Sequence, residues 1–255
     1  MIYNIRTLSL GVLLTVCLAA CGGSSDDSVV DGGVALSNLN DTGQTQFSDS
    51  VDFVAVQSSH PGQDGSYGRD ALIISGQLSK TGDGAAGFDF TKIDADGNDL
   101  DKLATSWSCV RDNVTGLVWE NQTETESNLR YTPTTALTKV DTVNTGGLCG
   151  SVNWRLPERK ELLSIVHYGL TVSGRSIDED YFPYTAPVSN YYWASERDTS
   201  NSENAWGVSF SGGSSSSYYE INNFHIRLVS GVSLSPRFTN NNNGTVSDEN
   251  TGLIW

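Results

Sequence analysis

The sequence predicts an α+β domain in which two helices lie between an early strand pair and a later run of twisted, mostly antiparallel strands. Residues 107–120 place apolar positions on both sides of a polar turn, which is typical of a β-hairpin. Residues 132–147 and 154–169 carry apolar positions at helical spacing. Strand-like patterns follow at 191–193, 205–210 and 224–229. This order of strands, helices and strands favours the α+β class.

The N-terminus resembles the signal peptide of a bacterial lipoprotein. Arg6 provides a positive charge, an uncharged apolar run follows, and the motif L-A-A-C ending at Cys21 resembles a lipobox. The run is too short to span a bilayer as a mature helix. We therefore expect cleavage of residues 1–20 and lipidation of Cys21. Gly22, rather than Asp, at the next position resembles lipoproteins sorted to the outer membrane. We therefore expect an outer-membrane lipoprotein that is exposed at the cell surface. A secretory signal without lipidation is the alternative.

The chain between the signal and the hairpin falls into two parts. Residues 21–40 are small and acidic, which predicts a flexible tether. Residues 41–106 form a loop- and strand-rich segment with Gly- and Asp-rich turns. Within it, residues 94–101 resemble part of a calcium loop, but an EF-hand needs Gly at its sixth position and Glu at its twelfth. We therefore expect a solvated turn there, and neither a metal nor a cofactor.

The composition restricts the class of partner. The formal net charge is −15, and Gly is abundant at 26 residues. Because so acidic a surface repels phosphate backbones, we expect no nucleic-acid partner. The expected partners are the membrane, through the lipid anchor, and a glycan or surface protein.

Four cysteines are present, and two of them are expected to pair. Cys17 leaves with the signal peptide and Cys21 is acylated, so Cys109 and Cys149 remain in an oxidising compartment. A bridge that closes a loop of about 40 residues contributes roughly 4 kcal/mol in the chain-entropy model. A two-cysteine metal site is the alternative, but no histidine lies at ligand spacing.

Both helices have recognisable ends. For the first, Thr132 is an N-cap candidate, Pro133 follows it, and Gly146 and Gly147 end the pattern. For the second, Pro157 fits the first helical position and Gly169 fits a left-handed C-cap. Its core-facing positions are Leu162, Leu163, Ile165 and Val166, and Trp154 and Arg155 are expected to fix how the chain enters it.

The tail repeats part of the hairpin. The frame V-x-D-x-x-T-G-L-[VI]-W occurs at 110–119 and again at 246–255. We expect residues 237–255 to be the start of a second, truncated repeat. The alternative is that the tail adds one hairpin to the first unit.

Several motifs together resemble the Lcl C-terminal domain family. They are D-x-x-T-G-L-x-W at 112–119, W-R-L-P-x-x-x-E-L at 154–162, I-D-x-x-Y-F-P at 177–183, Y-W-x-S at 192–195, A-W-x-V-x-F at 205–210 and a closing segment at 226–229. The resemblance covers residues 107–231. It implies a C-type-lectin-like fold, similar also to formylglycine-generating enzymes.

The resemblance implies a binding or adhesion module on the cell surface. A collagen-like bacterial adhesin in this family binds sulfated glycosaminoglycans, but this chain lacks the collagen repeat and is acidic. We expect a polysaccharide or another cell-surface ligand. Candidate ligand-binding residues are Tyr191, Tyr192, Trp193, Glu196, Arg197, Trp206, Tyr218 and Tyr219. For Trp193 and Trp206, a place in the strand core is the alternative.

Two other functions are weighed against binding. An enzyme of the formylglycine-generating type needs reactive cysteines, and a glycan hydrolase needs two carboxylates across a cleft. Residues 178–180 are acidic but adjacent, as in a solvated turn, and no nucleophile-elbow, P-loop or zincin motif is present. We therefore expect no catalytic residue. A structural envelope protein with a protein partner is the other alternative.

Overall fold

The computed structural model describes residues 39–49, 52–55, 60–169, 174–186, 190–234, 237–249 and 253–255. The predicted signal peptide, the lipidation site Cys21 and nearly all of the predicted tether lie outside these residues. Within the described part of the chain, no helix has the length and apolar character that crossing a membrane requires.

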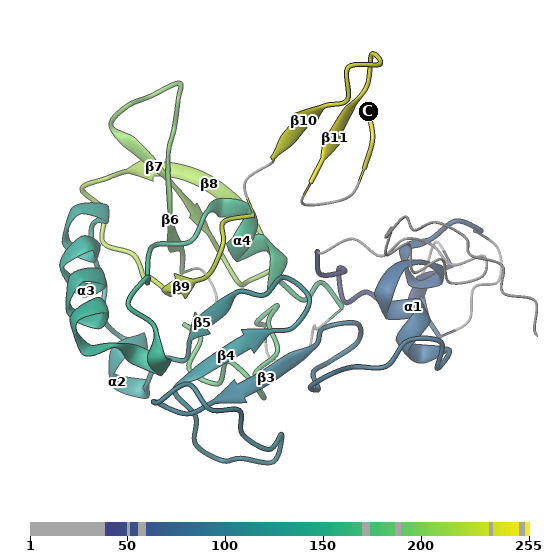
Figure 1. Cartoon of the computed structure of the whole chain (residues 1–255), viewed down its shortest axis with the longest axis horizontal. Coiled ribbons are helices and arrows are strands. Elements are labelled where there is room, and N and C mark those ends of the chain that lie inside the picture. Colours follow the sequence, from purple (N-terminus) through teal and green to yellow (C-terminus); the bar gives the residue numbers. More distant parts are fainter. Residues whose placement is uncertain are drawn as a thin grey trace, which may run out of the picture. The chain divides into compact units, whose positions relative to one another are not determined.

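The described residues form a mixed α+β structure with small antiparallel sheets (Figure 1). The helices are α1 (Gly68–Ile74), α2 (Glu124–Ser127), α3 (Pro133–Gly146) and α4 (Arg159–Ser164). The strands are β1 (Phe47–Ser48), β2 (Phe53–Val54), β3 (Phe90–Ile93), β4 (Cys109–Asp112), β5 (Val118–Glu120), β6 (Tyr192–Arg197), β7 (Asn204–Val208), β8 (Ser215–Tyr219), β9 (Val229–Ser230), β10 (Phe238–Asn240) and β11 (Val246–Asp248). The predicted α+β class is confirmed at this level.

The largest sheet has the strand order β3-β4-β5-β9, and all of its pairs are antiparallel. The predicted hairpin at 107–120 is confirmed as β4 and β5. Strand β3 comes from the segment 41–106 and pairs along β4, with Phe90 opposite Asp112 and Ile93 opposite Cys109. That segment therefore supplies part of the same sheet rather than only loops before it.

The second sheet has the order β6-β7-β8. Trp193 lies opposite Gly207, and the register shifts between Trp193 and Arg197. The serine-rich residues 215–217 belong to β8, because they pair along β7 from Ser217 opposite Trp206 to Ser215 opposite Val208.

Helix α3 begins and ends as its sequence predicts. Thr132 is the N-cap and accepts from the backbone N–H of Thr135, Pro133 is the first helical residue, and Gly147 closes the helix in the left-handed region at φ 67°. Ala136 and Val143 are buried, whereas Leu137 is 55% exposed. This last observation matters for the site described below.

Helix α4 is shorter than predicted at both ends. Glu158, not Pro157, precedes its first residue, because the Pro157 carbonyl accepts the Ser195 N–H of β6 at 2.8 Å. The helix ends at Ser164, and Gly169 is not its cap. Beyond it, the N–H groups of His167 and Tyr168 donate to Ser176 and Thr42, so the backbone follows other partners.

The closing segment 224–229 is also not one continuous strand. Phe224 pairs with Tyr131, and the His225 N–H donates to Tyr191. Only Val229 and Ser230 belong to β9. The chain changes partners because it passes from the neighbourhood of β6 to the edge of β5 within a few residues.

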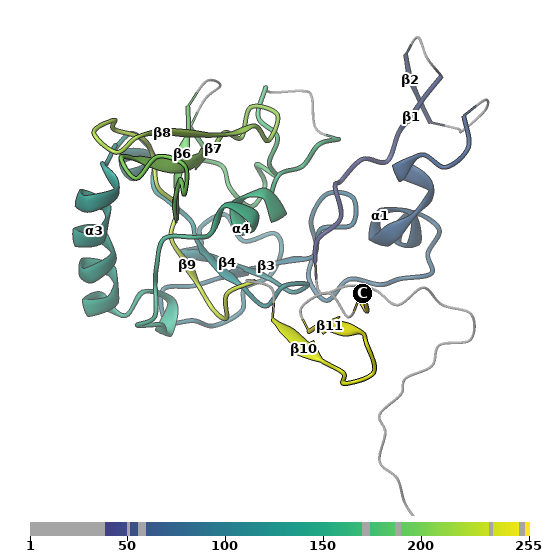
Figure 2. The same cartoon turned by 90° about the horizontal axis from the view of Figure 1, so that it is seen from above.

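Helix α4 lies between the two sheets (Figures 1 and 2). One core cluster joins Leu162 and Ile165 of this region to Phe90 and Trp119 of the first sheet and to Tyr192 of the second. The predicted core-facing stripe is confirmed, with Leu162, Ile165 and Val166 buried and Leu163 packed against the cluster. A second cluster forms around Trp154 and Trp193, between β6 and α3.

Residues 40–43 hold the early segment against the domain. The Asn40 side-chain amide donates to Asp112 Oδ2 at 2.6 Å and to the Ser164 carbonyl at 3.1 Å. Gly43 has φ 77°, and a Cβ there would come within 2.6 Å of His167 Nδ1. The positions of Asp112 and His167 are thus fixed partly by chain that precedes β3.

The tail forms its own small sheet. Strands β10 and β11 pair antiparallel, with Phe238 opposite Asp248. Trp255 exchanges two backbone hydrogen bonds with Val246 and so extends the sheet on the other side. No strand pair joins this sheet to the others within the described residues.

Candidate functional site

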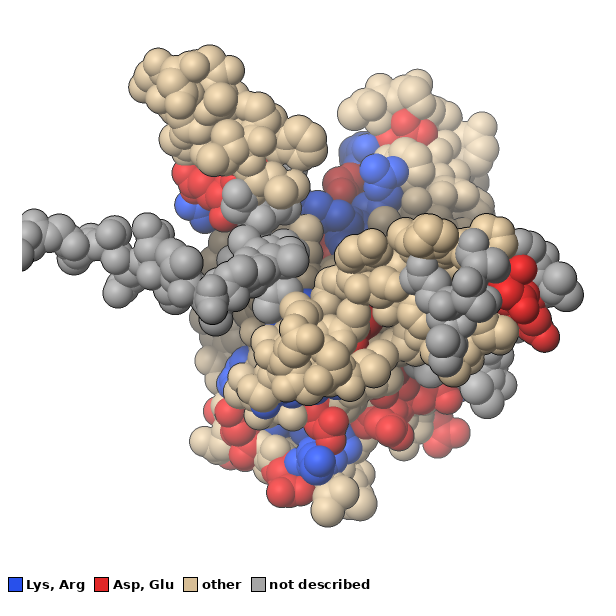
Figure 3. Space-filling model, turned by 90° about the vertical axis from the view of Figure 1, so that its right-hand side faces the viewer, with Lys and Arg blue, Asp and Glu red and all other residues tan. Residues whose placement is uncertain are grey.

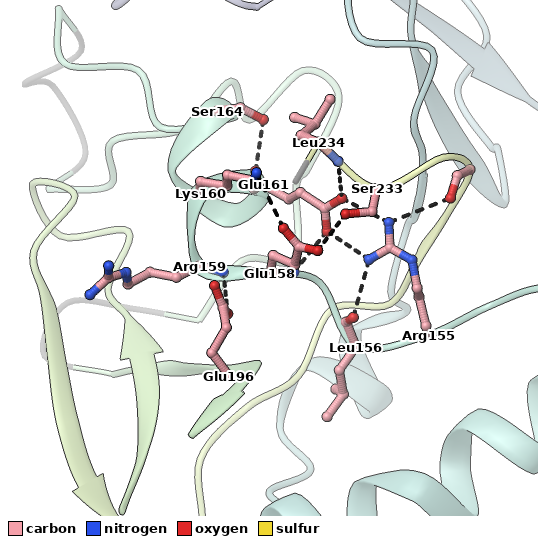
Figure 4. Close-up of polar contacts among 11 residues, drawn as sticks. Arg155, Leu156, Glu158, Arg159, Lys160, Glu161, Ser164, Glu196, Ser233 and Leu234 are labelled. Carbon is pink, nitrogen blue, oxygen red and sulfur yellow. Dashed lines mark hydrogen bonds and ion pairs between the residues drawn. The ribbon is translucent and has the colours of Figure 1, made fainter. Parts of the chain in front are cut away.

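The W-R-L-P segment is fixed by one buried carboxylate. The Arg155 guanidinium donates through both terminal nitrogens to the two carboxylate oxygens of Glu161, each at 2.7 Å (Figure 4). Glu161 is fully buried and also accepts the N–H groups of Glu158 and Leu234. This pairing raises the pKa of Arg155 above its usual value. The carboxylate therefore joins the start of α4 to the chain that follows β9.

Trp154 fixes the other side of this segment. Its indole N–H donates to the Leu148 carbonyl at 3.0 Å, and its backbone N–H donates to Asn144 Oδ1 at 2.7 Å. Arg155 and Val229 exchange two backbone hydrogen bonds. The sequence-based expectation that Trp154 and Arg155 set the entry into the second helix is confirmed.

This rigid segment forms one wall of a cleft, which we call the α3–β6 cleft. The cleft has a volume of about 420 Å³, within the range of small-ligand pockets. Its lining residues are Pro133, Thr134, Leu137 and Val140 from α3, Arg155, Leu156 and Glu158 from the W-R-L-P segment, Ala194, Ser195 and Arg197 from β6, and Ala205, Glu220 and Ser233. More apolar than polar surface faces the cleft.

The charged side chains of the cleft are already paired. Arg197 Nη2 lies 3.0 Å from Glu220 Oε2, and Arg155 is held by Glu161 as described. The Glu158 carboxylate accepts the Ser233 hydroxyl and lies 3.5 Å from Lys160 Nζ. Charged hydrogen-bond donors and acceptors are thus held at fixed positions beside apolar side chains such as Leu137 and Val140. This combination suits a neutral, hydroxyl-rich ligand.

The aromatic residues predicted to bind a ligand do not line this cleft. Tyr192 and Trp193 lie in the core instead of on a surface. Successive residues of a strand face opposite sides, and both sides of β6 are covered, so Tyr192 enters one core cluster and Trp193 the other. Trp193 therefore lies in the strand core, which was the alternative to ligand binding. Tyr192 also lies in the core, so its predicted place on a binding surface is corrected in the same way.

Trp206 and Glu196 lie beside α4. The Arg159 guanidinium stacks over the Trp206 ring at 4.1 Å from its centroid, and the indole is half-buried. Glu196 accepts the backbone N–H of Arg159 at 2.6 Å (Figure 4). Burial raises the pKa of the Glu196 carboxyl. Both side chains therefore help to hold the first turn of α4, and Trp206 keeps one accessible part.

Of the three remaining tyrosines predicted to bind a ligand, two pack against each other and one is exposed. Tyr191 and Tyr218 pack against one another, with ring centroids 4.6 Å apart, and both pack on Phe224. Tyr219 follows Tyr218 on β8, so it faces the other side of the sheet, and it is exposed. Among the predicted binding residues, Arg197 is the one that lines the α3–β6 cleft.

A second cavity of about 760 Å³ lies beside β3 and includes residues that the sequence did not single out. Lys92 is buried there, with its ammonium 3.8 Å from the centroid of the Trp107 ring. Asp178 is also buried and accepts the N–H groups of Ala85 and Asp180, so the expected solvated turn is wrong for Asp178. Burial raises the pKa of this carboxyl. The I-D-x-x-Y-F-P motif was the available signal, because Asp178 directly follows the buried residue Ile177, whereas Asp180 is exposed.

The predicted disulfide is present between Cys109 and Cys149, with Cα atoms 6.4 Å apart. It joins β4 to the turn after α3. Among the described residues, no group of three or more His, Cys, Asp or Glu side chains is arranged to hold a metal ion. Cys21 lies outside the described residues.

The family comparison agrees with the motifs. Residues 108–230 match the model of the Lcl C-terminal domain. Neither the curated proteins nor the solved structures gave a match. The match begins one residue before β4 and ends with β9, so it includes the disulfide and every lining residue of the α3–β6 cleft except Ser233, but not β3. Residues 108–230 of this chain are therefore an Lcl C-terminal domain.

Proposed function

We propose that this protein is a surface-anchored lipoprotein whose Lcl C-terminal domain binds a polysaccharide in the α3–β6 cleft. The observation that carries the proposal is the cleft itself, which is lined by apolar side chains together with paired arginine and glutamate side chains. A sugar presents both apolar C–H faces and hydroxyl groups, so it matches this combination. The role proposed is binding rather than catalysis.

The charges of the cleft favour a neutral polysaccharide over a sulfated one. Arg155 and Arg197 each have a carboxylate partner, so neither adds an uncompensated positive charge. A sulfated polyanion would gain less in the cleft than at an unpaired basic surface. Outside the cleft, the side of the molecule that carries α1 has both acidic and basic side chains on its surface (Figure 3).

The architecture supports a further part of the proposal, namely a C-type-lectin-like fold. The long helix α3, the short helix α4 and the small antiparallel sheets of the domain are compatible with that placement. The lipobox supports the anchor and the outer-membrane location. Labelling with radioactive palmitate should mark the wild-type protein and leave Cys21→Ser unlabelled, and surface proteolysis of intact cells should report which side the domain faces.

A glycan array tests the binding site. We would apply residues 22–255, without the lipid, in the presence of calcium and again with a chelator. Leu137→Glu places a charge on the exposed wall of the cleft and should weaken binding by about tenfold or more. Leu129→Glu is the matched control, since Leu129 is also an exposed leucine but does not line the cleft.

The outcomes separate the candidates. Equal binding by both variants would place the ligand elsewhere, and loss of binding with the chelator would require a cation. A blank array from protein with a closed disulfide would contradict the polysaccharide proposal. It would favour the second candidate, a structural envelope protein with a protein partner, which the exposed apolar side chains of β10 and the residues after β11 support.

A further inference from the structure

The strands of the tail repeat both the sequence frame of residues 110–119 and the register in which those residues pair. Phe90 lies opposite Asp112 and Phe238 opposite Asp248. The Asp112 N–H donates to the Leu117 carbonyl at 2.8 Å, and the Asp248 N–H donates to the Leu253 carbonyl at 2.9 Å. We call β3, β4 and β5 with their turn the first hairpin, and β10, β11 and residues 253–255 the second hairpin.

The register assigns each residue to one face. Directly opposed residues point to the same side of a sheet, so one face of the first hairpin, its core face, carries Phe90, Lys92, Val110, Asp112, Leu117 and Trp119. The corresponding face of the second hairpin carries Phe238, Asn240, Val246, Asp248, Leu253 and Trp255. Only the Lys92 and Asn240 pair differs in residue type.

The two core faces differ in what covers them. Phe90, Leu117 and Trp119 are at most 1% exposed, whereas Phe238, Leu253 and Trp255 are 62%, 52% and 73% exposed. Phe90 packs on Tyr181 and Phe182, and the same cluster contains Leu162 and Ile165. The cover of this face thus includes the W-R-L-P helix and the Tyr-Phe-Pro segment, both within residues 154–183, together with Tyr192 and Val208 of the second sheet.

We infer that the core face of the second hairpin is an interaction surface for a polypeptide of the same kind as residues 154–183, a covering part of an Lcl-type unit. Equal side chains at equal register positions present the same shape to the same cover. A lipid surface is a poorer occupant, because the face retains Asp248 in its centre, where Asp112 of the first hairpin accepts the N–H groups of Val114 and Thr115.

The test supplies the cover directly. A copy of residues 120–234 is joined after Trp255, because Glu120 follows Trp119 in the first unit. Its Cys149 is changed to Ser, since Thr245 stands where Cys109 stands in the first hairpin. Hydrogen exchange of the peptide 237–255 is compared with that in the unextended chain. We expect slowing of the β10 and β11 amides by about tenfold or more on extension.

Two matched variants identify the face that docks. Trp255→Ser, on the core face, should abolish the slowing, whereas Ile254→Ser, on the opposite face, should reduce it only in part, because its counterpart Val118 is half-buried against the second core cluster while Trp119 is fully buried. Unchanged exchange in an extended chain whose added segment is itself protected would overturn the inference. Equal effects of the two variants would also overturn it.

A second measurement does not depend on the added segment. The substitution Lys92→Asn, made in the unextended chain, removes the one difference between the two core faces. The first hairpin then has the same core-face residues as the second. If that face fits an Lcl-type cover, this variant should still unfold cooperatively and keep its β4 and β5 amides protected. Loss of protection there, in a chain whose second sheet remains protected, would contradict the inference.

Discussion

The first and second hairpins have nearly the same core-face side chains, but their large apolar side chains are buried in the first and exposed in the second. A hairpin of this size is marginal alone in water, so its stability depends on what packs against it. The first is covered by α4 and the Tyr-Phe-Pro segment, pinned by the Arg155–Glu161 pair and joined by a disulfide. The repeated motif therefore specifies the strand register and which side chains share one face of the sheet. The residues that pack on that face decide whether it becomes part of the core.

The largest expected difference in stability is between variants of Trp119 and Trp255, which occupy equivalent positions in the two hairpins. Trp119→Ala removes a fully buried ring and should lower the free energy of unfolding by about 3–5 kcal/mol. Trp255→Ala removes an exposed ring and should change it by less than about 0.5 kcal/mol. Urea denaturation of both variants measures the difference. Similar losses would show that the second hairpin is covered in solution.

The disulfide is the next difference, because Thr245 replaces Cys109 in the second hairpin. The bridge spans a sequence separation of 40 residues. Replacing both cysteines by serine should lower the free energy of unfolding by about 2–4 kcal/mol, chiefly by freeing the unfolded chain. Thr245→Ser should have almost no effect. A double variant as stable as the wild type in urea would show that the loop is constrained without the bridge.

The ion pair that holds the cover of the first hairpin should contribute more to the free energy of unfolding than the ion pair of the second hairpin. Glu161→Gln leaves the Arg155 guanidinium without its buried carboxylate and should cost about 2–3 kcal/mol. It should also speed exchange of the β5 amides, since it loosens the cover. Glu249→Gln removes an exposed partner of Arg237 and should cost less than about 0.5 kcal/mol. Equal costs would contradict this account of the cover.

The smallest effect depends on pH and concerns only the covered region. His167 is buried against Phe88 and Gly43, and desolvation lowers its pKa from 6.5 to about 4. Because the unfolded chain takes up the proton first, this stabilisation is complete above pH 6.5 and is lost as pH falls toward 4. The raised pKa of Asp70, about 6, acts in the opposite direction.

A difference measurement isolates the histidine. We expect His167→Phe, which keeps the stacked ring but cannot be protonated, to gain about 1–2 kcal/mol relative to the wild type between pH 7 and pH 5. The free energies of unfolding are compared at each pH by urea titration. A constant difference between the two proteins would show that His167 does not titrate in this range.

Much of the local structure follows from the sequence. Thr132, Pro133 and Gly147 set the ends of α3, since an N-cap, a fixed φ and a left-handed C-cap are properties of those residues. The D-x-x-T-G turn and the flanking apolar residues predicted the hairpin, and the expected oxidising compartment predicted the disulfide. For α4, Pro157 and Gly169 were misleading, because hydrogen bonds to β6, Ser176 and Thr42 decided its ends.

The site depended more on tertiary structure. No local pattern shows that both sides of β6 are covered, which buries Tyr192 and Trp193, or that α3 and β6 enclose a cleft with Leu137 on its wall. The repeated motif is the clearest case. The repeated frame in the sequence predicted that the hairpin motif occurs twice, whereas the shared register and the contrast between buried Trp119 and exposed Trp255 come from the folded structure, because burial requires a covering surface that the strand residues do not encode.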